Sequence, residues 1–208
     1  IITPFRAGRL DVPALKKLVE FQVRNGISGI VPCGTTGESA TLSFEEHEKV
    51  IQVVMEAARG RVPVIAGTGS NNTKEAVVLT RYAKKAGADA ALVITPYYNK
   101  PTQKGLLAHF KAIAGEVDIP VILYNVPGRT GVNMTADTVA RLSEEQNIVG
   151  VKEASGNLSQ ICDILRATPR TFCVLSGDDA MYFPMLTLGA KGVISVVSNV
   201  APREMADL

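Results

Sequence analysis

The stretch AGADAALVIT, residues 86 to 95, joins the end of a helix to a buried strand and decides the fold class. Gly87 suits the position just after a helix, where a left-handed backbone is common. The run that begins at Ala90 is short, continuous and apolar, which is typical of a strand covered on both faces. The same order recurs in NGISGIV (25–31) and LGAKGVI (188–194), with Gly26 and Gly189 at the helix ends. This weak repeat predicts units in which a helix leads into the next strand.

Seven apolar runs rich in valine and isoleucine are predicted to be strands, at 29–33, 62–67, 90–95, 120–124, 148–152, 172–176 and 192–197. Apolar residues at helical spacing lie between them, for example Leu15, Leu18, Val19 and Val23, and again Val50, Val53, Val54 and Ala57. We expect helix N-caps at Asp11, Ser43, Thr73 and Thr135, with Glu46 completing a capping box after Ser43.

Strict alternation of strand and helix indicates a parallel sheet, either closed as a (β/α)8 barrel or open and doubly wound. The seven runs and the opening IITP make the eight strands of a barrel, and no G-x-G-x-x-G follows the first strand. We expect one (β/α)8 TIM barrel domain over 1–208, clipped within the first strand and before the eighth helix, near Pro202. Without that helix apolar surface is uncovered, so residues 1–208 alone should be poorly soluble and nearly inactive.

Composition excludes several classes of protein. The 208 residues carry a net charge of +2 with no block of Lys or Arg, and aromatic residues are only 5%, which argues against nucleic-acid binding. Three cysteines without C-x-x-C spacing and two distant histidines indicate a reducing cytoplasm and no zinc site. No apolar run is long enough for a membrane span, so we expect a soluble, cytoplasmic protein.

Polar residues follow the predicted strands, where the working residues of such barrels lie. GTTGESATL (34–42) places Thr35 and Thr36 among glycines that let the backbone approach a ligand, which suggests a cradle for an anion or carboxylate. An ordinary turn that caps the next helix is the alternative. The motif lacks the G-K-[ST] of a P-loop.

Two further loops carry tyrosine and arginine. Tyr97 and Tyr98 lie in TPYYNKP (95–101), although tyrosine pairs are more often packing or interface residues. In YNVPGRTG (124–131), Tyr124 could carry protons and the guanidinium of Arg129 suits a carboxylate, unless Arg129 only holds the loop or an interface.

Three other polar residues are not expected to take part in catalysis. Asp178 and Asp179 in SGDDA are interpreted as helix N-caps and not as a catalytic carboxylate pair. His47 follows a capping box on a polar helix face, and we expect it to be solvated.

Lys152 stands at the end of the apolar run IVGVK (148–152), where a charged amine would be costly to bury. Desolvation at the mouth of the barrel would lower its pKa, so that the neutral amine could attack a ketone and form a Schiff base. Pairing with Glu153 at the rim is the alternative. Neighbours in a strand point to opposite faces, which favours the nucleophile.

Together these motifs closely resemble the dihydrodipicolinate (4-hydroxy-tetrahydrodipicolinate) synthase family, pyruvate-dependent enzymes of the class I aldolase type in lysine and diaminopimelate biosynthesis. GTTGES, TPYYNKP, YNVPGRTG, KEASGN and SGDDA occur in the family's order, and the resemblance covers essentially all 208 residues. It implies a lyase that condenses pyruvate with L-aspartate 4-semialdehyde. It implies no metal or other cofactor, and it implies a homotetramer built as a dimer of dimers.

The resemblance also implies residue roles. Lys152 would form the imine with pyruvate, and Tyr124 would relay protons with Thr35 and with Tyr98 from a neighbouring subunit. The remaining substrate-binding positions would be Thr36 for the pyruvate carboxylate, Arg129 for the semialdehyde carboxylate, and Gly177 and Ile194 as lining residues.

A lysine feedback site found in some members maps onto Ser39, Ala40, His47, Asn71, Glu75 and Tyr97. Phe44 stands where lysine-sensitive members tend to have a second histidine. The family also has a further C-terminal helical region.

Two other functions remain open at this point. Another pyruvate Schiff-base lyase, such as N-acetylneuraminate lyase or a keto-deoxy sugar acid aldolase, would share the barrel and Lys152, although Arg129 and the second threonine of GTTGE favour the synthase. A barrel that only binds a keto acid would need no proton relay, whereas this chain has every member of one.

Overall fold

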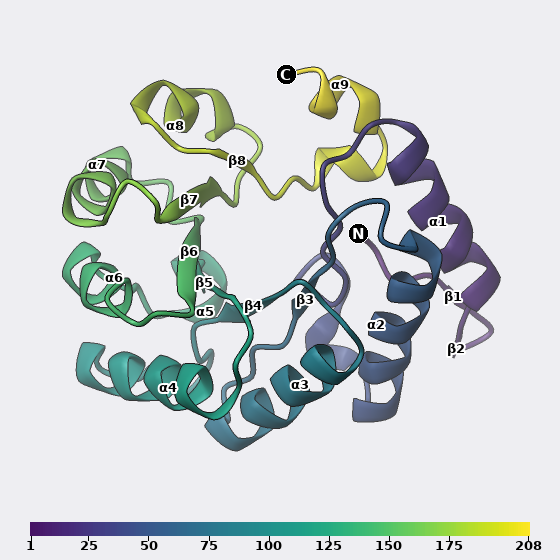
Figure 1. Cartoon of the computed structure of the whole chain (residues 1–208), viewed down its shortest axis with the longest axis horizontal. Helices are drawn as coiled ribbons and strands as arrows, with labels where there is room; N and C mark the ends of the chain where they lie inside the picture. Colours follow the sequence, from purple (N-terminus) through teal and green to yellow (C-terminus); the bar gives the residue numbers. More distant parts are fainter.

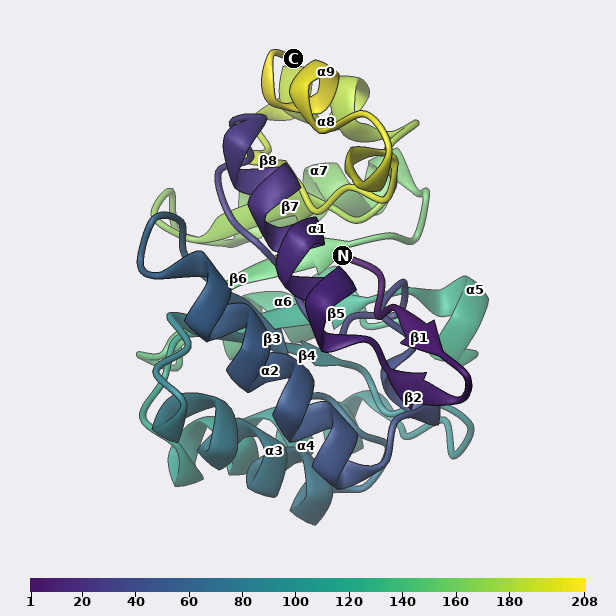
Figure 2. The same cartoon turned by 90° about the vertical axis from the view of Figure 1, so that its right-hand side faces the viewer.

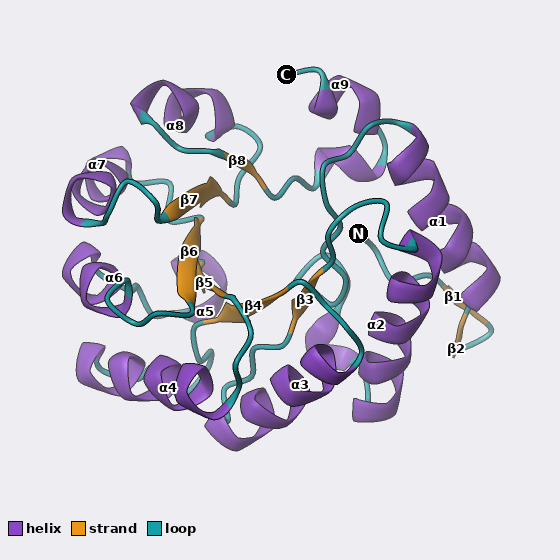
Figure 3. Cartoon of the chain, viewed as in Figure 1, coloured by secondary structure: helices purple, strands orange, loops and turns teal.

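The computed structural model describes residues 1–208 and is built around a six-stranded parallel sheet. Its strands are β3 (Ile65–Gly67), β4 (Ala90–Ile94), β5 (Val121–Asn125), β6 (Ile148–Glu153), β7 (Cys173–Ser176) and β8 (Gly192–Val193). They pair in the order in which they occur along the chain. The sheet curls around the centre of the molecule, and the longer helices lie outside it (Figure 1, Figure 3).

The helices begin and end close to the predicted signals. They are α1 (Val12–Arg24), α2 (Phe44–Ala58), α3 (Thr73–Lys85), α4 (Gln103–Glu116), α5 (Pro127–Thr130), α6 (Ala136–Leu142), α7 (Leu158–Ala167), α8 (Tyr182–Leu188) and α9 (Pro202–Ala206), with 3-10 turns at Ser39–Thr41 and Val197–Asn199. N-caps at Asp11, Ser43 and Thr135 are confirmed, whereas α3 is capped by Asn72, one residue before Thr73. None of these helices combines the length and apolar character needed to cross a membrane.

The predicted strand at 29–33 is cut short. Ile65 donates to the carbonyl of Ile30 and Gly67 donates to that of Pro32, as in a parallel ladder. Pro32 has no N–H to donate, and Cys33 has a left-handed backbone with φ +54°. Only one bridge, Ile30 with Val64, therefore forms there.

Strands also end early or are missing at the two ends of the chain. The opening IITP contains no strand, although the Ile1 nitrogen donates to the Val31 carbonyl over 2.9 Å. The last predicted run, 192–197, is a strand only over its first two residues.

A short hairpin was not predicted. It pairs β1 (Phe5–Arg6) with β2 (Arg9–Leu10) through Ala7 and Gly8, which have φ of +50° and +73°. Positive φ at both central residues is typical of tight hairpin turns. The hairpin lies on the same side of the molecule as α5, on the right in Figure 2.

The core has an outer layer and a smaller inner one. The outer layer joins the strands to the helices and holds large buried side chains such as Phe110, Leu123 and Val151. The inner cluster contains Leu92, Ile122, Tyr124 and Val126. Alternation along β5 sends Leu123 outward and Tyr124 inward, which brings a tyrosine to the inner face of the sheet.

Candidate active site

Lys152 lies on the inner face of the sheet, beside Tyr124. Residue pairing sets Lys152 on β6 opposite Tyr124 on β5 and Leu175 on β7. Paired residues of neighbouring strands project to the same face. The Lys152 Nζ atom consequently lies 4.2 Å from the centroid of the Tyr124 ring. Lys152 is only 7% exposed and takes part in no ion pair.

Burial controls the acidity of the Lys152 amine. Desolvation lowers its pKa from the ordinary 10.5 to about 8; the negative charge of Asp179 acts in the opposite direction, and the positive charge of Arg129 adds to the lowering. A neutral amine has a free lone pair, whereas an ammonium does not. Above neutral pH a substantial fraction of Lys152 is therefore a nucleophile.

The loop after the bridge at Ile30 lies against Lys152. Thr35, Thr36 and Lys152 line one small cavity of about 20 Å³, and Ile194 borders it from the other side. The backbone N–H groups of Thr35 and Thr36 donate to no protein acceptor. Unpaired N–H groups beside a buried amine can hold an anion such as a carboxylate.

A close contact with β3 fixes the start of this loop. A Cβ atom on Gly67 would lie 2.0 Å from the carbonyl oxygen of Cys33, so only glycine fits there. The contact lets the backbone turn at Cys33 and carry the two threonines over the end of the sheet.

Tyr124 is also buried, with 5% of its surface exposed. Burial raises the pKa of its phenol, and the nearby Thr35 side chain and the positive charge of Arg129 oppose that rise. A protonated phenol beside a hydroxyl can give and receive protons. Tyr124 and Thr35 thus form the beginning of a proton path next to the amine.

Of the remaining predicted residues, some meet Lys152 and others do not. Gly177 packs on its stem, since a Cβ there would lie 3.0 Å from Lys152 Cε. Arg129 is exposed on α5. Tyr98 is 88% exposed, with a left-handed φ of +71°, and lies outside the cavity that holds Lys152.

Two sequence-based interpretations are wrong. His47 is buried, because its Nε2 lies 2.7 Å from the Gly67 carbonyl oxygen and the ring fills the space under β3; burial also lowers its pKa. Asp178 and Asp179 do not cap α8, whose N-cap is Met181. Asp179 instead accepts hydrogen bonds from the segment after β8.

Ser195 and Val196, which were not predicted as site residues, line the cavity with Lys152. They belong to a run that was interpreted as strand throughout. Their position just after a strand, where loops carry function in such folds, was the available signal.

A second cavity, of about 200 Å³, gathers most of the predicted feedback residues. Ser39, Ala40, His47, Glu75 and Tyr97 line it together with Phe44. Asn71 is not in its lining, but the Asn71 carbonyl accepts from Asn99 Nδ2 over 3.1 Å. The Glu75 carboxylate accepts from Ser70 Oγ over 2.7 Å and from Asn72 Nδ2 over 3.3 Å.

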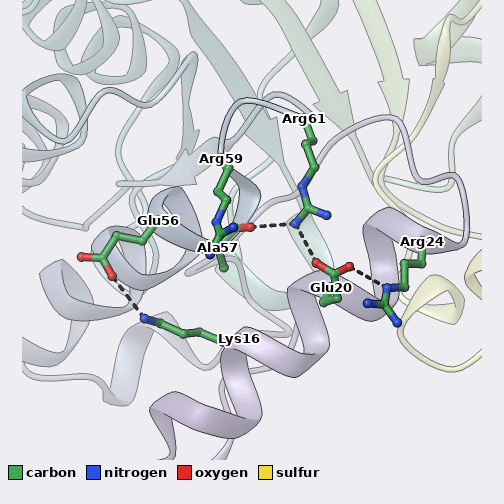
Figure 4. Close-up of a pocket in the computed structure, with 7 residues that line it drawn as sticks. All are labelled: Lys16, Glu20, Arg24, Glu56, Ala57, Arg59 and Arg61. Carbon is green, nitrogen blue, oxygen red and sulfur yellow. Dashed lines mark hydrogen bonds and ion pairs between the residues drawn. The ribbon is translucent and has the colours of Figure 1, made fainter.

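A charged hollow of about 450 Å³ lies at the opposite ends of the helices, between α1 and α2 (Figure 4). Glu20 pairs there with Arg24 at 2.6 Å and with Arg61 at 2.7 Å. Four basic and two acidic side chains line the hollow, and both acidic ones are in ion pairs at the surface; we assign the hollow no part in the chemistry. No group of three or more His, Cys, Asp or Glu side chains is placed to hold a metal ion.

Comparison with known proteins gives a consistent result over the whole chain. The family model described as the Dihydrodipicolinate synthetase family matches residues 1–208. The 4-hydroxy-tetrahydrodipicolinate synthase of Syntrophus aciditrophicus is 62% identical over 100% of this chain, which spans 72% of that protein.

Solved structures agree in both sequence and shape. The dihydrodipicolinate synthase of Aquifex aeolicus is 56% identical, with a TM-score of 0.98 over 100% of this chain and 71% of its own. The chloride-inhibited synthase of Acinetobacter baumannii, complexed with pyruvate, is 51% identical, with a TM-score of 0.97 over 100% of this chain and 72% of its own. The chain belongs to the dihydrodipicolinate synthetase family.

Proposed function

We propose that this chain condenses pyruvate with L-aspartate 4-semialdehyde to 4-hydroxy-tetrahydrodipicolinate, as a lyase of lysine and diaminopimelate biosynthesis, through a Schiff base on Lys152. The observation that carries the role of Lys152 is a buried amine without an ion pair, whose pKa is lowered to about 8, beside unpaired backbone N–H groups. An amine of this kind attacks a ketone, and the N–H groups suit the carboxylate next to it.

The chemistry follows from the cation that forms. Lys152 Nζ adds to the ketone carbon of pyruvate, and loss of water leaves a positively charged iminium. That charge withdraws electrons from the neighbouring methyl group, which gives up a proton. The iminium thereby becomes a neutral enamine. The enamine carbon then forms the new bond to the aldehyde carbon of the second substrate, which restores the iminium on Lys152. The amine of the second substrate attacks the iminium carbon, and departure of Lys152 Nζ closes the ring and frees the lysine. Each step needs a positioned proton carrier.

The other residues support these steps. Thr36 and the backbone N–H groups at 35 and 36 hold the pyruvate carboxylate. Tyr124 and Thr35 carry protons, and a neighbouring copy of the chain supplies Tyr98. Arg129, exposed beside the site, receives the carboxylate of the semialdehyde, while Gly177 and Ile194 shape the walls.

Trapping with borohydride tests the mechanism. Pyruvate plus borohydride should label Lys152 irreversibly, which mass spectrometry of peptides would locate. Lys152→Arg should remain unlabelled, since a guanidinium stays protonated. Labelling of another lysine would refute the role of Lys152. Faster turnover with N-acetylneuraminate than with pyruvate and semialdehyde would indicate the sugar-acid lyase activity instead.

We also propose that residues 1–208 form one domain whose strands close as a (β/α)8 barrel. Contacts between the first and last segments support closure: Ile2 N donates to Asn199 Oδ1 over 3.0 Å, and Gln22 Nε2 donates to the Ser198 carbonyl over 2.8 Å. These hydrogen bonds join residues that are separated in sequence by nearly the whole length of the chain.

For assembly we propose a homotetramer, a dimer of dimers, in the cytoplasm. An exposed tyrosine in a left-handed conformation, Tyr98, supports an interface at its loop. Mixing inactive Tyr98→Phe chains with inactive Lys152→Ala chains should restore part of the activity, because some sites regain both residues. No recovery in verified mixed dimers would place Tyr98 in its own subunit's site.

The cavity bordered by Glu75, His47 and Tyr97 is proposed as a lysine feedback site. Its support is the carboxylate of Glu75 at the cavity wall, which can receive an ammonium group. Lysine should inhibit turnover, and Glu75→Gln should weaken that inhibition. An enzyme insensitive to lysine would overturn this proposal.

A further inference from the structure

Asp179, in the loop between β7 and α8, is hydrogen-bonded to the segment that follows β8. Its Oδ2 accepts from the backbone N–H of Val196 over 3.0 Å and of Val197 over 3.1 Å. These bonds connect the loop between β7 and α8 to the segment that follows β8, and β7 and β8 are neighbours in the sheet (Figure 1). A single carboxylate oxygen thus holds two loops together.

Both of these loops form walls around Lys152. Gly177, two residues before Asp179, packs so closely on the Lys152 stem that a Cβ atom there would lie 3.0 Å from Lys152 Cε. Ile194, Ser195 and Val196 border the cavity that contains Lys152. Movement of either loop would change the space in which an imine on Lys152 must fit.

The second oxygen of Asp179 has no partner. Oδ1 is buried and accepts no hydrogen bond, and no Lys or Arg forms an ion pair with this carboxylate. An unpaired buried carboxylate oxygen is costly, so a positive charge close by would stabilise it. Formation of an iminium on Lys152 would supply such a charge permanently, at any pH.

We propose that Asp179 is a positioning residue of the imine site, which clasps the two loops through Oδ2 and offers its buried charge to the cation on Lys152. The inference rests on the proposed Schiff-base function. The charged and titratable groups that act on Lys152 from the surrounding elements are Asp179, Arg129 on α5 and Tyr124 on β5. Asp179 is the one negative charge among them.

Asp179→Asn separates the role of the negative charge from the role of the hydrogen bonds to Val196 and Val197. The amide oxygen can still accept from Val196 and Val197, but the negative charge is gone. The rate of pyruvate trapping at Lys152, followed against pH, should have its acid limb shifted down by roughly 0.5–1 pH unit, because a favourable neighbour of the ammonium is lost. Turnover should fall about tenfold, as expected when charge stabilisation of a reacting group is weakened.

Two further variants keep the result interpretable. Asp178→Asn changes the exposed neighbour, whose side chain accepts only from Ala180 N over 2.9 Å, and should leave the acid limb in place. Asp179→Glu keeps the negative charge on a longer side chain. Turnover should fall, but the acid limb of the pH profile should stay at its wild-type position. An acid limb unmoved in Asp179→Asn, or moved equally in Asp179→Glu, would overturn the charge role. Absence of pyruvate trapping in the wild type would instead refute the Schiff-base function itself.

Discussion

Lys152 and Glu153 are neighbours in β6, both are buried, and both carry an ionisable group, yet their surroundings differ completely. Glu153 is 1% exposed and accepts from Asn125 Nδ2 over 3.0 Å, Ser155 N over 2.7 Å and Gln160 Nε2 over 3.4 Å. Lys152 is 7% exposed and has the face of the Tyr124 ring beside its amine, with no ion pair.

The strand explains the difference, because it sends consecutive side chains to opposite faces. On the outer face, Asn125 and Glu153 are paired in register, and their contact ties β5 to β6 and to the loops beyond. On the inner face an amine remains without a carboxylate to neutralise it. Groups that hold a fold together are satisfied, whereas a group kept for reaction is left with an unused bonding capacity.

The largest effect is expected for Lys152→Met. Activity and pyruvate trapping should disappear, while the free energy of unfolding should stay level or increase, since a buried amine is replaced by an apolar chain of similar length. Denaturant unfolding at pH 7 and borohydride trapping would measure both. Lys104→Met, at an exposed position, serves as the control. Strong destabilisation by Lys152→Met would mean that the amine has a structural partner after all.

Tyr124→Phe should reduce turnover by roughly 10²-fold, the usual scale for the loss of a positioned proton carrier. Folding should change little because the ring is retained. Steady-state kinetics with both substrates would give the effect, and Tyr82→Phe, remote from the inner face, provides a matched removal of a phenol oxygen. Near-normal turnover would remove Tyr124 from the proton path.

Glu153→Gln should show the opposite behaviour from Lys152→Met. Its amide NH₂ must face the donors of Asn125 or Gln160, so the free energy of unfolding should fall by about 1–3 kcal/mol. The folded fraction should still trap pyruvate. Urea unfolding of this variant, with exposed Glu144→Gln as control, makes the measurement. Loss of trapping without loss of stability would assign Glu153 to the chemistry.

The smallest effect concerns pH. The Lys152 pKa is lowered to about 8 in the fold from 10.5, so below pH 8 the amine is protonated in both folded and unfolded chains and the cost of burying its charge is fully present. Between pH 8 and 10.5 the unfolded chain binds more protons, which raises the stability of the fold. The stability advantage of Lys152→Met should therefore shrink by roughly 1–2 kcal/mol from about pH 8 to about pH 10. A gap that is constant with pH would contradict this shift.

Periodicity predicted much of this arrangement. Alternation along IVGVK placed Lys152 and Glu153 on opposite faces, and the apolar runs located the six strands of the sheet. The roles of His47 and Asp179 were missed, because they depend on partners 20 and 17 residues away, Gly67 and Val196, which no local pattern encodes. The strand predicted at 29–33 is longer than the one observed. Pro32 lacks the backbone N–H that would continue the ladder, and the apolar pattern alone does not show that this N–H is needed.

The contact between Gly177 and Lys152 has a consequence for binding entropy. A side chain with several rotatable bonds is held between a glycine, whose absent Cβ would lie 3.0 Å from Cε, and an aromatic ring 4.2 Å from Nζ. A free lysine loses about 2 kcal/mol of rotamer entropy when it is fixed. In this protein the Lys152 side chain has already lost that rotamer entropy during folding. When pyruvate binds, only the substrate has to be ordered.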